Sequence, residues 1–166
     1  MASSADTVAE ALKTQLAAIV GGTGGYIYTP SAVRRVVFWP DESALDPTLD
    51  TIYLIRTGRK VTSRYDSYRL ERRQEFRILC CHRFTEPSEH PTAANPDADP
   101  IREQIGQDME ADVVRAIWAD VRLGQPSVVI DAMAEPWQTD PDWWTSSWVV
   151  VEVRIVVRYQ HAQDDR

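Results

Sequence analysis

Cysteine and histidine side chains provide the first candidate chemistry in this sequence. Cys80 and His82 are two positions apart in a run that alternates like a β-strand, so both side chains would lie on one face. This spacing could begin a zinc site, but a structural site takes four ligands and the sequence offers no C-x-x-C pair. We therefore interpret Cys80 as a reduced core residue beside a partly exposed histidine. Cys81 would point to the opposite face, and we expect no disulfide, no metal and no cofactor.

A glycine-rich segment, G-G-T-G-G at 21–25, has the composition of a phosphate-binding loop. It follows a predicted helix rather than a strand, and it lacks the Lys and Ser/Thr of the P-loop pattern. We interpret it as a helix C-cap and hinge. The sequence has no H-E-x-x-H or G-x-S-x-G pattern, and its acidic residues are scattered through predicted turns and helix faces. These residues predict no catalytic site, so we do not expect an enzyme.

Arginine, lysine and tyrosine are interleaved in one basic segment, residues 59–73. Such a pattern could contact nucleic acid. A solvated hairpin arm, or a docking surface for an acidic protein, fits the same residues, because Tyr and Arg are also frequent in protein interfaces. We favour the arm or docking surface, with Arg69, Arg72 and Arg73 as candidate interface residues.

Four tryptophans gather around a predicted turn, at positions 137, 143, 144 and 148. A turn does not easily bury four indole rings, and aromatic residues left at a rim favour a subunit interface. Trp143 and Trp144 are therefore further interface candidates. In the alternative interpretation, all four tryptophans cap one end of the core.

The clearest element that must position these residues is the stretch 147–159, S-W-V-V-V-E-V-R-I-V-V-R-Y. Its odd positions from Val149 to Tyr159 form an unbroken apolar row, while charged residues interrupt the even positions. This alternation is typical of a half-buried strand, and the β-branched residues favour a strand over a helix. We expect this row to be core, with the other elements packed on it.

An amphipathic helix is predicted over residues 4–20, with an apolar stripe that runs from Val8 to Val20 and ends at Gly21 and Gly22. Additional strands are predicted in four places by alternating or β-branched runs. These candidate strands span residues 33–39, 51–56, 74–84 and 128–132.

A second helix is predicted to begin with Asp99 as its N-cap and Pro100 at its first helical position. Its apolar residues recur every four positions from Ile101, we extend this stripe to Trp118, and Gly124 marks the stop. The preceding residues, 86–100, carry four prolines and little apolar bulk. They predict a long exposed loop.

Length and charge limit the class of protein. We expect the 166 residues to form a single α+β domain, 1–166, in which a mixed or antiparallel sheet packs against two main helices. The net charge of −7 disfavours a dedicated nucleic-acid binder. Apolar runs fall short of the roughly 20 residues that a membrane span requires. The first residues, M-A-S-S-A-D, do not resemble a signal peptide, so we expect a cytoplasmic location.

Two segments near the end of the sequence resemble a known family. They are V-V-R-A-I-W-A-D-V-R-L-G at 113–124 and W-V-V-V-E-V-R-I-V-V-R-Y-Q-H at 148–161. In both, the chain is similar to the tail terminator, or tail completion, proteins of long-tailed bacteriophages. The shared pattern is a helix that ends near A-D-x-R-L-G, a short strand, and a closing strand that finishes on Arg-Tyr. It covers roughly the last third of the chain.

The resemblance implies a small α+β subunit of the virion tail, at the head–tail junction, assembled in the host cytoplasm. Six copies would typically form a homo-oligomeric ring that contacts the tail tube protein on one side and the head–neck connector protein on the other. DNA would pass through the acidic lumen without specific binding. A connector or neck protein of the same particle is the alternative within this class, and a small cytosolic enzyme is the alternative outside it.

Overall fold

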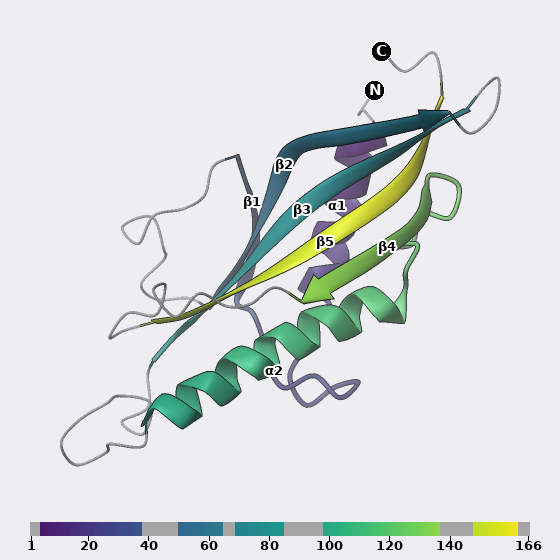
Figure 1. Ribbon diagram of the computed structural model, residues 1–166. Helices are drawn as coiled ribbons and strands as arrows, with labels where there is room; N and C mark the ends of the chain where they lie inside the picture. Colours follow the sequence, from purple (N-terminus) through teal and green to yellow (C-terminus); the bar gives the residue numbers. More distant parts are fainter. Residues whose placement is uncertain (1–3, 38–49, 65–68, 85–97, 137–147, 163–166) are drawn as a thin grey trace.

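The computed structural model describes residues 4–37, 50–64, 69–84, 98–136 and 148–162. These residues form two helices and one five-stranded sheet. In chain order the elements are α1 (Ser4–Ala17), β1 (Ala32–Val36), β2 (Thr51–Arg64), β3 (Arg69–Arg83), α2 (Ala98–Ala119), β4 (Val129–Pro136) and β5 (Trp148–Ala162). Both helices pack on one face of the sheet (Figure 1). The predicted α+β class, with a mixed sheet packed against two helices, is confirmed.

The strands lie in the order β1-β2-β3-β5-β4. β1 pairs with β2 in parallel, and the other neighbours are antiparallel. The two outer strands are staggered, because β1 pairs only with Thr51–Ile55 of β2, whereas β4 pairs with Val153–Tyr159 of β5. We call the end of the sheet near Thr51 and Trp148 proximal, and the end near Arg64 and Ala162 distal. β1 therefore flanks β2 only in the proximal half of the sheet, and β4 flanks β5 only in the distal half.

The core lies between the helices and the sheet. The apolar row of β5 is fully buried, so the prediction that it forms the core is confirmed. The even positions of β3 face the same side, because they stand opposite the odd positions of β5 in the register. Helix residues that complete the core are Val8, Leu12 and Leu16 of α1 with Met109, Val113 and Ile117 of α2.

The strands of the central hairpin are longer than predicted. We expected strands at 51–56 and 74–84, but β2 continues to Arg64 and β3 begins at Arg69. The described residues of the basic segment, 59–64 and 69–73, are therefore the distal part of this hairpin, as the hairpin interpretation predicted, and we call them the distal arm. Polar and charged residues there have weak strand propensity of their own, so pairing with β5 must maintain the extension.

The predictions for the helices and for the loop before α2 need three corrections. α2 begins at Ala98, so residues 98–100 of the predicted loop 86–100 belong to the helix, and the rest of that loop lies outside the described residues. α1 ends at Ala17 rather than at residue 20, so Gly21 and Gly22 do not cap it directly, and Val20 is 46% exposed.

In α2, the predicted apolar stripe does not include Trp118, which is 71% exposed. A four-residue repeat drifts by about 40° per step around a helix, so Ile101 at its start is 37% exposed. Trp118 directly follows Ile117, about 100° further around the helix, and lies on the side opposite Met109.

Candidate functional site: the outer face and the distal arm of the sheet

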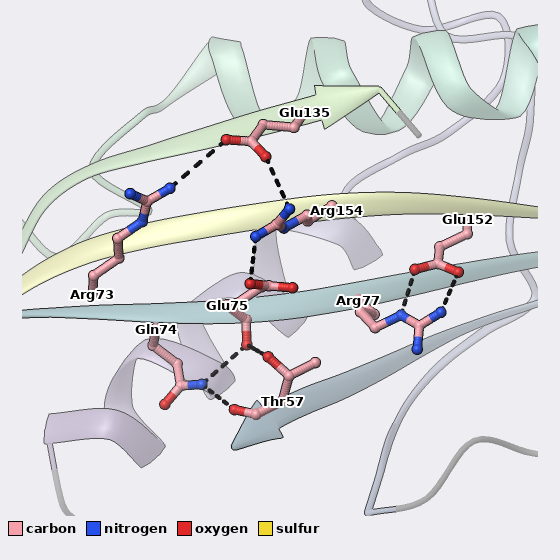
Figure 2. Close-up of polar contacts among 8 residues, drawn as sticks. All are labelled: Thr57, Arg73, Gln74, Glu75, Arg77, Glu135, Glu152 and Arg154. Atoms are coloured by element: carbon pink, nitrogen blue, oxygen red, sulfur yellow. Dashed lines mark hydrogen bonds and ion pairs between the residues drawn. The ribbon is translucent and has the colours of Figure 1, made fainter. Parts of the chain in front are cut away.

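The outer face of the sheet, which points away from the helices, carries a chain of ion pairs (Figure 2). Arg154 of β5 lies between two carboxylates, with Nη2 2.6 Å from Oε2 of Glu75 and Nη1 3.7 Å from Oε2 of Glu135. Glu135 continues the chain to Arg73, at 3.9 Å. A second pair is bidentate, since Nε and Nη2 of Arg77 both contact the carboxylate of Glu152. Strands β3, β5 and β4 are thus joined by side chains as well as by backbone.

These ion pairs resolve a conflict in the register. Arg77 of β3 stands directly opposite Arg154 of β5, and like charges in that position destabilise a sheet. Each guanidinium instead reaches diagonally to a carboxylate, Arg77 to Glu152 and Arg154 to Glu75. The hydrogen bond from Arg77 to Glu152 raises the pKa of Arg77 above its ordinary value, so this group stays charged. A register slip of one residue would remove all of these pairs.

The proximal end of the outer face is apolar instead. Tyr53, Leu79, Cys81, Trp148 and Val150 form a buried cluster there, separate from the main core. Burial raises the pKa of the Cys81 thiol to about 12, so it is protonated at neutral pH. Trp148, one of the four clustered tryptophans, is therefore a core residue. The two interface candidates at positions 143 and 144 lie outside the described residues.

A large bulge bends β2 where the distal arm begins (Figure 1). Arg56 pairs with Phe76 and Lys60 with Gln74, so residues 57–59 of β2 face the single residue Glu75. Such insertions bend a strand and increase its twist. The buried Gln74 amide holds the bulge, because its NH₂ donates to the carbonyl oxygens of Thr57 and Glu75 (Figure 2). Its oxygen accepts a hydrogen bond from Nε of Arg56 at 3.2 Å.

The three basic interface candidates of the distal arm do not form one surface. Arg72 and Arg73 are consecutive in β3 and point to opposite faces. Arg73 is half-exposed on the outer face, whereas Arg72 lies on the helix face, opposite Tyr159. Nε of Arg72 is buried and has no hydrogen-bond partner in the described part of the chain. The backbone of Arg69 pairs with Ala162 at the distal end of β3.

A buried carboxylate that sequence reasoning missed anchors the glycine-rich segment. Oδ2 of Asp112, on the core side of α2, accepts hydrogen bonds from the backbone N–H groups of Ile27 and Tyr28, at 2.7 and 2.6 Å. Arg115 donates to the carbonyl oxygen of Gly25 and lies 3.3 Å from Oδ1 of Asp112. The sequence signal was an acidic residue inside an apolar stripe. The segment is thus held as a rigid turn by α2, and we find a structural role for it.

The A-D-x-R-L-G segment forms the turn that ends α2. Asp120 accepts hydrogen bonds from the backbone N–H groups of Arg122 and Gly124, at 3.0 and 2.6 Å. Leu123 and Gly124 both have positive φ, 52° and 66°, and Leu123 is buried in the core. The side chain of Asp120 and the conformational freedom of Gly124 therefore specify a tight turn. The carbonyl oxygen of Val121 then accepts the Ala132 N–H at 2.7 Å, which fixes the turn against β4.

The cysteine and histidine of β3 serve the fold. Cys80 is fully buried in the main core, and burial raises its pKa well above the ordinary value. His82 lies on the same strand face, with Nδ1 2.9 Å from Oδ2 of Asp50. No group of three or more metal-ligating side chains occurs within the described ranges. The interpretation of Cys80 as a core residue beside a partly exposed histidine is confirmed.

A pocket of about 350 Å³ lies where β1 ends, between α1 and β2. Its apolar walls come from the core side of both elements, and two guanidinium groups stand at its rim. The lining residues are Ala9, Arg35, Val36, Val37, Leu54, Arg56 and Phe76. Both guanidinium groups are already paired with carboxylates of α1, Arg35 with Glu10 and Asp6 and Arg56 with Asp6, so the pocket has an apolar lining and a rim of paired charges.

No protein-family model matches the chain, and no curated protein shows significant similarity to it. Within the described residues, neither helix is both long and apolar enough to cross a membrane. Function must therefore be inferred from this geometry and from the resemblance carried by residues 113–124 and 148–161.

Proposed function

We propose that the protein is a structural subunit of a bacteriophage tail, which self-associates into a ring, caps the tail tube and meets the head–neck connector. The two segments that carry the resemblance support this proposal. Residues 113–124 form the end of α2 and its turn, and residues 148–161 form nearly all of β5. β4 joins them, because it pairs with β5 and its Ala132 N–H donates a hydrogen bond to the carbonyl oxygen of Val121 in the turn. They thus build one continuous unit in the fold.

The observation that carries the proposal is the exposed tryptophan within that unit. Trp118 is 71% exposed and Val121 is 42% exposed, one on the last turn of α2 and the other in the turn that follows. Asp120 and the bond to Ala132 hold this region rigid, so the patch is already in place before any contact. Exposed tryptophan on a rigid element is typical of the anchors that carry binding energy in protein interfaces. We assign the Trp118 patch to the contact between neighbouring subunits.

The charge of the chain fits the same role. Each subunit carries a net −7, so a ring would be strongly acidic. An acidic lumen would let DNA pass without adhering to it, because binding DNA requires basic groups that displace counterions.

Electron microscopy of the purified protein tests the proposal, with rings that have a central hole as the expected result. Trp118→Arg should give monomers at concentrations where the wild type forms rings, while circular dichroism shows that the subunit stays folded. Met133→Arg is the matched control, since Met133 is 51% exposed but lies on the outer face of β4. A wild type that stays monomeric at all accessible concentrations would contradict the ring.

A co-sedimentation assay separates the tail terminator from the connector alternative. A terminator should sediment with purified tail tubes, whereas a neck protein should sediment with filled heads. If Trp118→Arg still forms rings, the proposed ring stands, but the Trp118 patch is not the contact between its subunits.

A further inference from the structure

A ring requires two different surfaces on each of its subunits. In a ring of more than two copies, every contact joins one surface of a subunit to a different surface of the next. The Trp118 patch, which we assign to this contact, therefore needs a complementary surface elsewhere on the chain. That surface must be exposed, apolar and held at a fixed angle to Trp118, because a variable angle would not close a ring.

The glycine-rich turn, V-G-G-T-G-G-Y-I at 20–27, is exposed and apolar. Val20 and Ile27, at its two ends, are 46% and 63% exposed. The two ends lie side by side, because a Cβ added at Gly21 would lie only 2.6 Å from the carbonyl oxygen of Ile27. The turn contains no charged residue, and charged side chains are rare at the centre of protein interfaces.

The other exposed large apolar side chains of the described residues, apart from the Trp118 patch, are scattered. Val37 follows β1, Ile101 lies near the start of α2, and Met133 lies on the outer face of β4. In the part of the chain that the structure describes, the glycine-rich turn is thus where two such side chains occur together outside the Trp118 patch.

The tip of the turn leaves room for a flat ring. Residues 22–25 are all exposed, and no atom lies within 4 Å of the place where a Cβ at Gly22 would stand. Gly22 has a φ of 79°, a conformation that favours glycine, so the tip is bare backbone there. An indole can therefore approach these peptide groups while its edges contact the two flanking apolar side chains.

Helix α2 holds this turn at a fixed angle to Trp118. The turn packs against α2, where Asp112 accepts hydrogen bonds from the backbone N–H groups of Ile27 and Tyr28 (Figure 1). Arg115 donates a further hydrogen bond to the backbone of the turn. Trp118 follows Asp112 by six residues, which places it about 120° further around the helix axis. One rigid element thus points the two surfaces in different directions, as a contact that repeats around a closed ring requires.

We propose that Trp118 of each subunit packs on the glycine-rich turn of the next copy of this chain, an assignment that rests on the ring proposed above. The indole lies over the tip of the turn, between Val20 and Ile27. The contact is head-to-tail, so every subunit of a closed ring uses both surfaces.

Single substitutions in the full chain, followed by electron microscopy and size-exclusion chromatography, test the turn first. Ile27→Glu, Ile27→Arg and Val20→Glu should each prevent ring formation, as Trp118→Arg should, because each puts a charge where the indole packs. Met133→Glu is the control and should form rings like the wild type, since Met133 lies on the outer face of β4. Circular dichroism checks that all variants are folded.

Mixing two monomeric variants tests whether Trp118 and Ile27 meet. In an equal mixture of Trp118→Arg and Ile27→Glu, the two variants can alternate around a ring. Each unchanged tryptophan then faces an unchanged turn, and each introduced arginine faces an introduced glutamate, so rings should return. A mixture of Trp118→Arg with Ile27→Arg should stop at dimers, because like charges would meet at every second contact.

Two results would overturn this contact while leaving the ring in place. Folded Ile27 variants that form rings like the wild type would show that Trp118 packs elsewhere. Mixtures with Ile27→Glu and with Ile27→Arg that behave alike would show that Ile27 does not face Trp118. A wild type that forms no rings would instead contradict the proposed function, and the head-to-tail contact with it.

Discussion

The two faces of β5 differ in how they are stabilised. The odd row, from Val149 to Tyr159, is apolar throughout and fully buried under the helices. The even row changes along the strand, from Trp148 and Val150 in an apolar cluster to Arg154 and Arg158 in ion pairs. The odd row needs only apolar neighbours, which many registers would supply. The ion pairs of the even row form only when particular charged residues lie nearby on the neighbouring strands. The even row therefore selects one of the registers that the odd row would allow.

The largest expected effect is on the odd row. Val153→Asp would bury a carboxylate without a partner, because Val153 is fully buried. This costs about 5 kcal/mol, comparable with the whole stability of a typical domain. We expect no soluble folded protein, measured as the soluble fraction after expression and by circular dichroism.

A matched change on the other face provides the control for this first prediction. Met133→Asp makes a similar change from an apolar to an acidic residue on the outer face of β4, where the side chain is 51% exposed. Its cost should stay within about 0.5 kcal/mol. If both variants unfold alike, the two faces are not distinguished by burial.

The odd row could be predicted from the sequence because its signal is local. Period-two alternation and β-branched residues decide both the strand and its buried face, and no knowledge of the partners is needed. The same reasoning placed Cys80 in the core and located both helices within a few residues. Trp118 was misplaced because it directly follows Ile117, and successive residues of a helix lie about 100° apart, so it does not share the buried side of the repeat.

The distal arm could not be predicted in full because its causes are not local. β2 reaches Arg64 only because β3 pairs with it and β5 pairs with β3. The bulge depends on Gln74, whose partners are a carbonyl oxygen 17 residues away in sequence and the carbonyl oxygen of the next residue. Asp112 likewise anchors a segment 84 residues earlier. No pattern of propensity encodes such contacts.

The second prediction concerns the bulge, where core face and arm meet. Gln74→Met keeps the size of the side chain but leaves the Thr57 carbonyl oxygen without the amide donor. An unsatisfied buried group costs about 1–3 kcal/mol, so the unfolding midpoint in denaturant should fall by that amount. Amide hydrogen exchange should accelerate more in the distal part of β2 than in its proximal part.

Gln74→Ala sharpens this result, because it removes the same hydrogen bonds and also leaves a cavity. It should destabilise the protein further than the methionine variant. Equal exchange rates in both halves of β2 would contradict a local role of Gln74 in holding the arm.

The smallest expected effect separates two ion pairs on the even row of β5. The Arg154–Glu75 pair has side-chain exposures of 23% and 18%, whereas the Arg158–Asp131 pair has exposures of 46% and 26%. Double-mutant cycles with Arg154→Met and Glu75→Gln, and with Arg158→Met and Asp131→Asn, measure the coupling in each pair. We expect about 1 kcal/mol for the first and about 0.3 kcal/mol for the second, because water competes more strongly for exposed charges.

Salt distinguishes the two pairs further. At about 1 M salt the screening length falls to roughly 3 Å, which affects exposed charges more than partly buried ones. The Arg158 coupling should then vanish, while most of the Arg154 coupling should persist, since Arg154 also lies 3.7 Å from Glu135. Equal coupling energies that fall equally with salt would show that the even row acts as a solvated surface. The selection of register would then have to come from the apolar cluster of Trp148 and Val150 alone.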